Sequence, residues 1–337
     1  MLPKRLVFCG GGTRCLVFLQ ALVELEQKGH LTKVNEYWGT SAGAMIATLF
    51  ALSKSSSTVK NLMFSANYKN FRDVDISNIF GIQTSWGIDD GKLLVTEIEK
   101  LVDSIHPGNK TKCLRDITGL NIVVSDLTLR KTIVCNSNTF PDLRVVDAIR
   151  ASMSLPIFFK PYIHTNGHIW VDGAIRANFP WHILPDDKAR SESLGFTFDK
   201  TINKQPPKTF MEYLYSMIRF DEPNTIQILK EKWVRNIIWF KQPPYPSWFV
   251  RLKSEDFQMV EQIGSEAVNA WLIHQEPYSK SLKNHPLSAH RYIHAPICRQ
   301  DRINELSDSR EPCHELDRGF SQPQCAYKRP SFRRWSV

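Results

Sequence analysis

Three consecutive glycines near the start of the chain constrain its fold most strongly. Gly10, Gly11 and Gly12 follow an apolar run over 5–9 that is typical of a buried strand, and they precede apolar residues at helical spacing over 15–28. The glycines therefore form a strand-to-helix loop. Such a loop lets backbone N–H groups approach a ligand closely and face a developing negative charge.

Ser41 lies at a second junction between a predicted strand and a predicted helix. Residues 31–38 favour a strand, with 34–38 as its narrower span, and 42–52 form an almost unbroken apolar helix. In one interpretation this turn is a nucleophile elbow, in which the serine projects its hydroxyl above the sheet. An ordinary capped turn contains the same residue types, so the pattern by itself leaves both interpretations open.

The residues beside Ser41 favour the nucleophile. Gly39 and Gly43 carry no side chain, which avoids clashes in a strained elbow. The helix that starts at Ala42 directs its positive end, and the N–H of Ala42, toward an oxyanion formed at the serine. The elbow would therefore hold a nucleophile and an oxyanion donor together.

Asp172 is the candidate general base. It ends a short predicted strand, and Gly173 and Ala174 follow it in a tight turn. In an α/β protein, a side chain at the end of such a strand faces the open edge of the sheet.

The glycine loop also comes close to the dinucleotide-binding fingerprint Gly-x-Gly-x-x-Gly. Its third position here is Cys15, and the acidic residue that should follow the loop would have to be Glu36. This alternative explains neither Ser41 nor Asp172. We therefore expect no nucleotide cofactor.

The glycine loop with its Arg14, the Gly-x-Ser-x-Gly elbow and the Asp-Gly-Ala turn, in this order, resemble the patatin-like phospholipases. The resemblance extends over 151–161 before the aspartate and over Asn178-Phe179-Pro180 after it, and it covers roughly residues 5–200. It implies an α/β fold, a patatin-like three-layer α/β/α sandwich with a mainly parallel central sheet. It also implies a serine esterase with a Ser–Asp dyad and no catalytic histidine.

Carried over position by position, the resemblance makes Ser41 the nucleophile and Asp172 the general base. The expected oxyanion-hole residues are Gly10, Gly11, Gly12 and Ala42, and the motifs are supported by Thr13, Arg14, Gly39, Gly43, Gly173 and Ala174. One position departs, because Cys15 stands where the family usually has glycine. Cysteine is small and a residue that starts a helix needs no positive φ, so we expect it to be tolerated.

Such a dyad places a demand on its aspartate, whose ordinary pKa of about 3.9 makes it a weak base at neutral pH. Partial burial, direct contact with the serine hydroxyl and a strong oxyanion hole would together compensate for this weak basicity. A conventional triad is the alternative, because His182 follows Asp172 in the chain order of α/β-hydrolases. The short spacing, which includes Pro180, leaves little room to fold back across a sheet, so we expect His182 to have another role.

The composition suits one large catalytic domain over 1–274. The chain has 337 residues, 42% of them hydrophobic. It has no evident targeting segment, and no apolar stretch approaches the roughly 18 residues of a spanning helix. Seven cysteines, an odd number without a Cys-x-x-Cys pair, indicate reduced thiols, so we expect a cytoplasmic protein.

The sequence predicts no metal site. Cys298, Cys313 and His314 have a spacing that fits no familiar zinc pattern. No acidic loop of the form Asp-x-Asp-x-Asp-Gly occurs, which argues against a calcium-dependent mechanism. We therefore expect chemistry without a metal or an organic cofactor.

Residues 275–337 carry 11 Lys or Arg against 7 Asp or Glu and show no apolar period, which predicts a basic, largely disordered tail. Its end, 328–335, interleaves basic and aromatic residues and suits an anionic membrane surface, but an ordinary solvated terminus has the same composition. Nucleic acids attract similar residues, although we do not expect them as partners. An aromatic, proline-rich stretch over 233–249 either dips into lipid or packs against the catalytic domain.

Periodicity predicts several further elements. A helix capped by Asp89-Asp90 runs to about 104, with one apolar face made by Leu93, Leu94, Ile98 and Leu101. Strands are expected over 120–127, 130–137 and 193–199, and helices over 145–152, 209–219, 225–232 and 256–274.

Together these observations predict a lipid acyl hydrolase that cleaves carboxylic esters of glycerophospholipids, and also of acylglycerols, at a peripheral membrane or lipid surface. Two alternatives remain open. One is a lipid-binding or scaffold module with the same fold and little turnover, and the other is a lipid acyltransferase, because the same residues permit transfer to water or to another lipid. The sequence identifies no protein partner.

Overall fold

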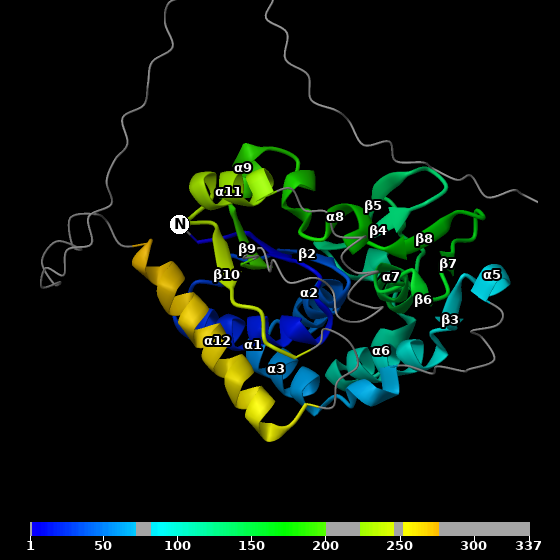
Figure 1. Cartoon of the computed structure of the whole chain (residues 1–337), viewed down its shortest axis with the longest axis horizontal. Coiled ribbons are helices and arrows are strands. Elements are labelled where there is room, and N and C mark those ends of the chain that lie inside the picture. Colours follow the sequence, from blue (N-terminus) through cyan, green and yellow to red (C-terminus); the bar gives the residue numbers. More distant parts are fainter. Residues whose placement is uncertain (1, 72–81, 200–222, 246–251, 276–337) are drawn as a thin grey trace, which may run out of the picture. The chain divides into compact units, whose positions relative to one another are not determined.

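A mainly parallel sheet runs through the centre of the computed structural model (Figure 1). The structure describes residues 2–71, 82–199, 223–245 and 252–275. All of them belong to the compact unit Met1–His285, whereas the unit Pro286–Val337 lies outside the described residues. The helix expected over 209–219 also lies outside them.

Eight strands of the described residues form the central sheet, in the order β10, β9, β1, β2, β4, β8 and β7, with β5 paired to β4. In chain order they are β1 (Arg5–Phe8), β2 (Glu36–Thr40), β4 (Leu120–Asp126), β5 (Lys131–Cys135), β7 (Tyr162–Ile163), β8 (Ile169–Asp172), β9 (Ser193–Phe198) and β10 (Ile237–Phe240). The run from β10 to β4 is parallel, whereas β5 and β8 lie antiparallel to β4 and β7 antiparallel to β8. A separate parallel pair joins β3 (Gly87–Asp89) to β6 (Ile157–Phe159).

Helices cover both faces of the central sheet. One face packs against α1 (Val17–Gln27), α2 (Ala42–Ser53), α3 (Ser56–Ser65), α6 (Lys92–Ile105), α7 (Val145–Ser152) and α12 (Ser254–Ile273). The other packs against α8 (Ala174–Ala177), η5 (Pro180–Ile183) and α11 (Pro223–Lys232). The remaining helical segments are η1 (Gly12–Leu16), η2 (Tyr68–Phe71), α5 (Ile82–Ser85), η3 (Asn109–Thr111), η4 (Leu114–Asp116) and α9 (Asp187–Ser191).

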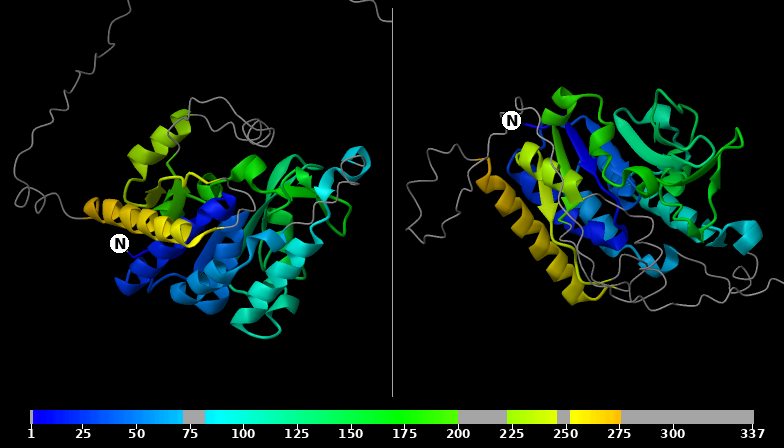
Figure 2. Two further views of the ribbon diagram at one scale, coloured as in Figure 1. Left: turned by 60° about the horizontal axis from the view of Figure 1, so that its bottom comes forward. Right: turned by 45° about the horizontal axis from the view of Figure 1, so that its top comes forward.

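The side chains of β1 explain why the sheet needs two covering layers. Leu6 and Phe8 are buried in the cluster on the α1 side, and Val7 between them is buried in the cluster on the α11 side. Successive side chains of a strand point to opposite faces, so a strand that is apolar throughout must be covered twice. The three-layer α/β/α sandwich expected from the sequence is confirmed, and Figure 2 shows α12 lying along α1 from two further directions.

Most expected elements are present, with shifts at their ends. The hairpin β4–β5, helix α7 and strand β9 lie within one or two residues of the predicted spans. Strand β2 starts later than predicted, at Glu36, because residues 30–33 turn and Asn35 N already donates to Lys4 O. Residues 12–16, ahead of α1, form the 3₁₀ segment η1 instead of belonging to the loop and the helix.

Two stretches near 90 and 240 differ in part from the expectation. Asp89 ends β3 and accepts from Gly91 N, and the N-cap position of α6 is Gly91 in a left-handed conformation with φ 75°. Asp90 does cap the first turn as expected, because its Oδ1 accepts from Lys92 N over 3.0 Å. The stretch over 233–249 contains a strand, β10, which adds to the sheet beside β9. The strand itself was not expected, but Ile237, Ile238 and Phe240 are buried, which agrees with the alternative that this stretch packs against the domain.

Candidate active site

Ser41 occupies a sharp turn between β2 and α2. Its backbone lies at φ 55° and ψ −127°, a conformation that costs energy for a residue with a side chain. A Cβ on Gly39 would lie 2.3 Å from Gly43 O, and a Cβ on Gly43 would lie 2.5 Å from Cys9 O. Glycines at both positions therefore let the chain reverse so tightly that the Ser41 hydroxyl stands clear of the sheet.

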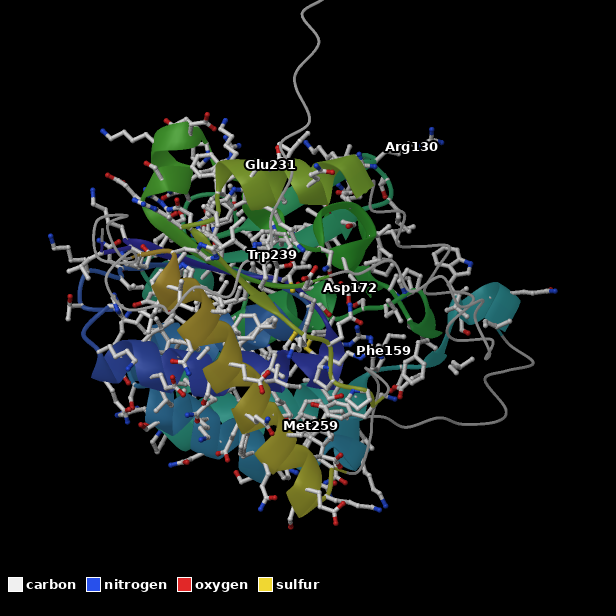
Figure 3. The ribbon with its side chains drawn as sticks, turned by 60° about the vertical axis from the view of Figure 1, so that its left-hand side comes forward. Arg130, Phe159, Asp172, Glu231, Trp239 and Met259 are labelled. Atoms are coloured by element: carbon white, nitrogen blue, oxygen red, sulfur yellow. The ribbon has the colours of Figure 1, made fainter. Side chains whose placement is uncertain are left out.

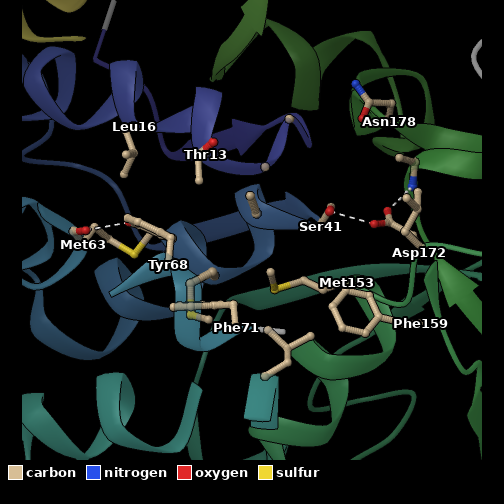
Figure 4. A pocket seen from close by; sticks show the side chains of 17 residues that line it. Thr13, Leu16, Ser41, Met63, Tyr68, Phe71, Met153, Phe159, Asp172 and Asn178 are labelled. Atoms are coloured by element: carbon tan, nitrogen blue, oxygen red, sulfur yellow. Dashed lines mark hydrogen bonds between the residues drawn. The ribbon is translucent and has the colours of Figure 1, made fainter. Parts of the chain in front are cut away.

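Asp172 meets Ser41 from the neighbouring part of the sheet. Ser41 Oγ donates a hydrogen bond of 2.7 Å to Asp172 Oδ2, and Ala174 N donates one of 2.8 Å to Asp172 Oδ1 (Figure 4). The carboxylate is 2% exposed. The two residues come together because β2 and β8 both pair with β4, with Val124 opposite Asp172 and Val123 opposite Thr40.

Two serines that the sequence reasoning missed hold both residues in place. Ser152 Oγ accepts a hydrogen bond of 2.8 Å from Ser41 N and donates one of 2.7 Å to Val123 O. Asp172 N donates to Ser154 O over 2.9 Å. The signal was present as a pair of serines at the end of an amphipathic helix, but serine at a helix end is too common to stand out.

The glycine loop supplies backbone donors beside Ser41, with one difference from the expectation. Within the described residues, nothing accepts a hydrogen bond from the N–H of Gly11, Gly12 or Ala42. Gly10 differs, because its N–H already donates to Asn178 O over 3.0 Å. In this conformation Gly10 is therefore not a donor for an oxyanion, and three of the four expected groups are available.

Arg14 lies at the back of the glycine loop. Its guanidinium donates to Tyr245 O and to Gln242 Oε1, each over 3.0 Å, and Tyr245 OH donates to Thr13 O over 3.4 Å. The arginine thus ties the segment after β10 to the loop. Cys15, which replaces the usual glycine, is 1% exposed and packs into the core.

A mainly apolar pocket opens beside Ser41 and Asp172 (Figure 4). Its volume is about 810 Å³, counted with the solvent at its mouth. Its apolar wall includes Leu16, Met45, Met63, Phe71, Leu94 and Leu155. Figure 3 shows Asp172 near Phe159, which also lines the pocket, while Met259 marks α12 on another part of the surface. Such a pocket can hold a hydrocarbon chain next to the reacting hydroxyl.

A buried arginine supports the wall of this pocket. The Arg150 guanidinium donates to Ser154 Oγ and, over 3.0 Å, to Lys160 O, and it lies 5.1 Å from the centre of the Phe159 ring. Burial lowers the pKa of Arg150 to about 10, against the opposing effect of Asp89 and Asp90. The group therefore stays charged at neutral pH and connects β3, β6 and the segment that holds Asp172.

Three histidines lie close to Asp172 in the sequence, and the contacts described for their rings are with other residues. His168 Nδ1 is 2.9 Å from Asp126 Oδ2, and the His164 ring stacks on Trp170 with centres 4.3 Å apart. His182 is exposed, and no hydrogen bond joins its ring to Ser41 or Asp172. The geometry therefore gives no support to a triad that includes His182.

The described part of the chain contains no cluster of three His, Cys, Asp or Glu able to hold a metal ion. Cys9, Cys15, Cys113 and Cys135 form no disulfide among the described residues, whereas Cys298, Cys313, Cys325 and His314 lie outside them. Among the described helices, none is long and apolar enough to cross a bilayer.

Of the stretch over 233–249, residues 233–245 are described, and they pack against the domain. Trp233 and Tyr245 are each 8% exposed, and Phe240 is fully buried. Trp239 is half-buried, and the last two aromatics of this stretch, Trp248 and Phe249, lie outside the described residues.

The chain is similar to several known proteins. It is 25% identical over 224 residues to the uncharacterized protein R571 of Acanthamoeba polyphaga mimivirus, covering 64% of this chain and 74% of that protein. It is 25% identical over 188 residues to the probable lipid hydrolase 463L of Invertebrate iridescent virus 6, covering 52% and 61%. Among solved structures, VipD from Legionella pneumophila shares the fold with a TM-score of 0.51 and 14% identity, covering 80% of this chain and 67% of that one.

The family comparison agrees with the motifs. The family model described as patatin-like phospholipase matches residues 6–185, more than half of the chain. The matched region contains the glycine loop, the serine elbow and the Asp172 turn, which meet in the site described above. This chain belongs to the patatin-like phospholipase family.

Proposed function

We propose that this chain is a serine esterase that hydrolyses carboxylic esters of glycerophospholipids, and also acylglycerols, with Ser41 and Asp172 as its dyad. The 2.7 Å hydrogen bond from Ser41 Oγ to Asp172 Oδ2 is the observation that carries the proposal. The family and the apolar pocket beside the dyad support a lipid ester as substrate. The similarity to a probable lipid hydrolase points the same way.

In the acylation step, Ser41 Oγ attacks the ester carbonyl carbon and its proton passes to Asp172 Oδ2. The negative charge that forms on the carbonyl oxygen is stabilised by the N–H groups of Gly11, Gly12 and Ala42. The bond from carbon to the leaving alcohol then breaks, and the alcohol takes the proton from Asp172. The product is an acyl ester on Ser41.

In the second step, water attacks the acyl carbon and gives a proton to Asp172. When this tetrahedral intermediate collapses, the proton returns to Ser41 Oγ and the fatty acid leaves. An alcohol or a lysolipid in place of water would give acyl transfer by the same sequence of bonds. The acceptor therefore decides between hydrolase and acyltransferase.

We also propose that the protein acts in the cytoplasm as a peripheral protein at a lipid surface. The net charge of +9, to which the tail over 275–337 contributes, favours encounter with anionic lipids. Binding to the surface would bring the pocket to its substrate without a spanning segment.

The test is release of fatty acid from vesicles of phosphatidylcholine and phosphatidylglycerol, with and without a chelator of divalent cations. We expect wild type to release fatty acid in both conditions, and Ser41→Ala and Asp172→Asn to lose at least about 100-fold in rate. Ser104→Ala, an exposed serine in the last turn of α6, is the matched control and should match wild type. If these proteins bind vesicles but none of them releases fatty acid, the proposed enzymatic activity is contradicted and a lipid-binding module is favoured.

A further inference from the structure

Asn178 is a buried side chain whose hydrogen-bonding capacity the fold does not use. It follows α8, is 7% exposed and lines the pocket beside Ser41 and Asp172. Its Oδ1 is buried without a hydrogen-bond partner, and within the described residues its Nδ2 has none either. An unsatisfied buried amide costs about 1–3 kcal/mol, so its presence beside a reactive group calls for an explanation.

The backbone around Asn178 is held firmly. Asn178 O accepts from Gly10 N over 3.0 Å, and Ala177 O accepts from Thr40 Oγ1 over 2.9 Å. These bonds connect Asn178 to the glycine loop and to the residue that precedes Ser41. The backbone that carries its side chain is therefore fixed relative to both parts of the site.

Gly10 lies in the gap between the Asn178 amide and the nucleophile. A Cβ on Gly10 would lie 2.9 Å from Asn178 Oδ1 and 2.9 Å from Ser41 Cβ. Only glycine leaves room for Asn178 Oδ1 and Ser41 Cβ to come this close together, and Nδ2 lies on the other branch of the amide. Figure 4 shows the amide of Asn178 turned toward the side of the pocket on which Ser41 and Thr13 lie.

We propose that Asn178 is a catalytic residue whose Nδ2 donates a hydrogen bond to the ester carbonyl oxygen as it becomes an oxyanion. Its own carbonyl occupies the Gly10 N–H, and its side chain supplies the donor that Gly10 cannot. The oxyanion then has four donors, from Asn178, Gly11, Gly12 and Ala42. This inference rests on the proposed function, because it assigns a role in the attack by Ser41.

The test compares Asn178→Ala with Asn109→Ala. Asn109 is the matched control, because it is 2% exposed and its Oδ1 also lacks a partner, but its Nδ2 donates to Val102 O away from the pocket. Two quantities are measured for each: kcat and KM on a short-chain nitrophenyl ester, and the inhibition constant of a trifluoromethyl ketone. The ketone forms a tetrahedral oxyanion on the serine and so reports on the donors directly.

We expect Asn178→Ala to lower kcat by about 100- to 1000-fold and to weaken inhibition by the ketone by a similar factor, with KM nearly unchanged. Asn109→Ala should lower the melting temperature and leave both quantities as in wild type. If Asn178→Ala keeps the wild-type kcat, or loses kcat with unchanged inhibition by the ketone, the inference is wrong.

Asn178→Asp keeps the shape of the side chain and carries the test if the alanine variant does not fold. It replaces the donor by a negative charge, so we expect an even larger loss of kcat and of ketone affinity, and wild-type values would overturn the inference. A wild-type protein that neither hydrolyses esters nor reacts at Ser41 would remove the proposed function and this inference together. An active wild type with an unaffected Asn178 variant would remove the inference alone.

Discussion

At the scale of single residues, the site depends on a serine whose strained backbone is held by another serine. Ser41 has a positive φ, and its N–H is satisfied by Ser152 Oγ, which is fully buried and bonded in turn to Val123 O. If Ser152 Oγ is removed, no other group described in the turn accepts a hydrogen bond from Ser41 N–H. Ser152 therefore stabilises the elbow and positions Ser41, the proposed nucleophile.

Ser152→Ala tests this role. The change leaves the Ser41 N–H without its partner, so we expect about 1–3 kcal/mol less stability and a kcat lowered at least tenfold, with KM little changed. Ser193→Ala is the control, because Ser193 is also buried and bonds Ala189 O, but it lies outside the pocket lining. Equal losses of activity in both variants would mean that Ser152 only stabilises the fold.

Asp126 gives a prediction about pH. Burial raises its pKa, but hydrogen bonds from Leu129 N, the His168 ring and the Trp170 indole outweigh it and hold the pKa below its ordinary value. A carboxylate of this kind contributes stability above its unfolded pKa of about 3.9, and that contribution is lost as the pH falls through the folded pKa.

We therefore expect Asp126→Asn to be less stable than wild type at pH 7 in denaturant unfolding. The difference in the free energy of unfolding should start to shrink below about pH 4, where the unfolded chain takes up the proton, and should be lost as the pH falls through the lowered pKa of folded Asp126. A difference that stays as large below the folded pKa of Asp126 as it is at pH 7 would show that the charge of Asp126 plays no part.

Single residues were predictable where a motif singles them out. Ser41 and Asp172 stand in short patterns with glycines, and the structure brings them within hydrogen-bonding distance. The roles of Ser152 and Asn178 depend on which backbone groups face them, and spacing in the sequence carries no such information. For the same reason the bond that occupies the Gly10 N–H could not be foreseen.

At the scale of elements, the packing of α12 on α1 depends on close contact between two backbones. A Cβ on Gly264 would lie 2.7 Å from Val17 O and 2.8 Å from Gln20 Cβ. Glycine weakens a helix interior by about 1 kcal/mol relative to alanine, so its presence in the middle of α12 is explained by the neighbour and not by the helix itself.

Gly264→Ala therefore separates packing from helix propensity. We expect the variant to unfold at a lower temperature, by the equivalent of about 1–3 kcal/mol, although propensity alone predicts a gain. Asn269→Ala, at an exposed position of the same helix, should leave the melting temperature unchanged or raise it slightly. A higher melting temperature for Gly264→Ala would contradict the close packing.

Elements with a strong apolar periodicity were predicted well, and elements that depend on pairing or packing with a distant segment were not. Helices α2 and α7 have apolar patterns of their own, and their ends agree with the sequence to within one residue. Strand β10 lies among aromatics and prolines, and it becomes a strand because β9 offers it a parallel edge. Gly91 caps α6 because its left-handed φ suits the turn after β3, a preference that the neighbouring aspartates obscured.

At the scale of the whole molecule, the residues after 274 are basic and differ in composition from those before them. The described residues lie in the unit Met1–His285, and the boundary at 274 proposed from composition stays a prediction. Fold class was predictable because strands alternate with helices and three motifs fall at strand ends. The acceptor of the acyl group and the preferred headgroup depend on shape and contacts that the sequence does not encode in any short pattern.

Deleting residues 320–337 tests the role of the basic end in lipid binding. Each of its cations contributes about 1 kcal/mol at an anionic surface, so we expect co-sedimentation with phosphatidylglycerol vesicles to weaken by about tenfold or more. Hydrolysis of a short-chain nitrophenyl ester, which needs no surface, should stay at the wild-type rate. Unchanged co-sedimentation would rule out this segment as a membrane contact.

The proposed nucleophile is tested most simply by labelling the folded protein with a fluorophosphonate, followed by intact mass and peptide mapping. We expect a single adduct on Ser41 in wild type, none in Ser41→Ala, and labelling slowed by at least about 100-fold in Asp172→Asn. No adduct on Ser41 in wild type, or labelling of Asp172→Asn at the wild-type rate, would contradict the proposed dyad.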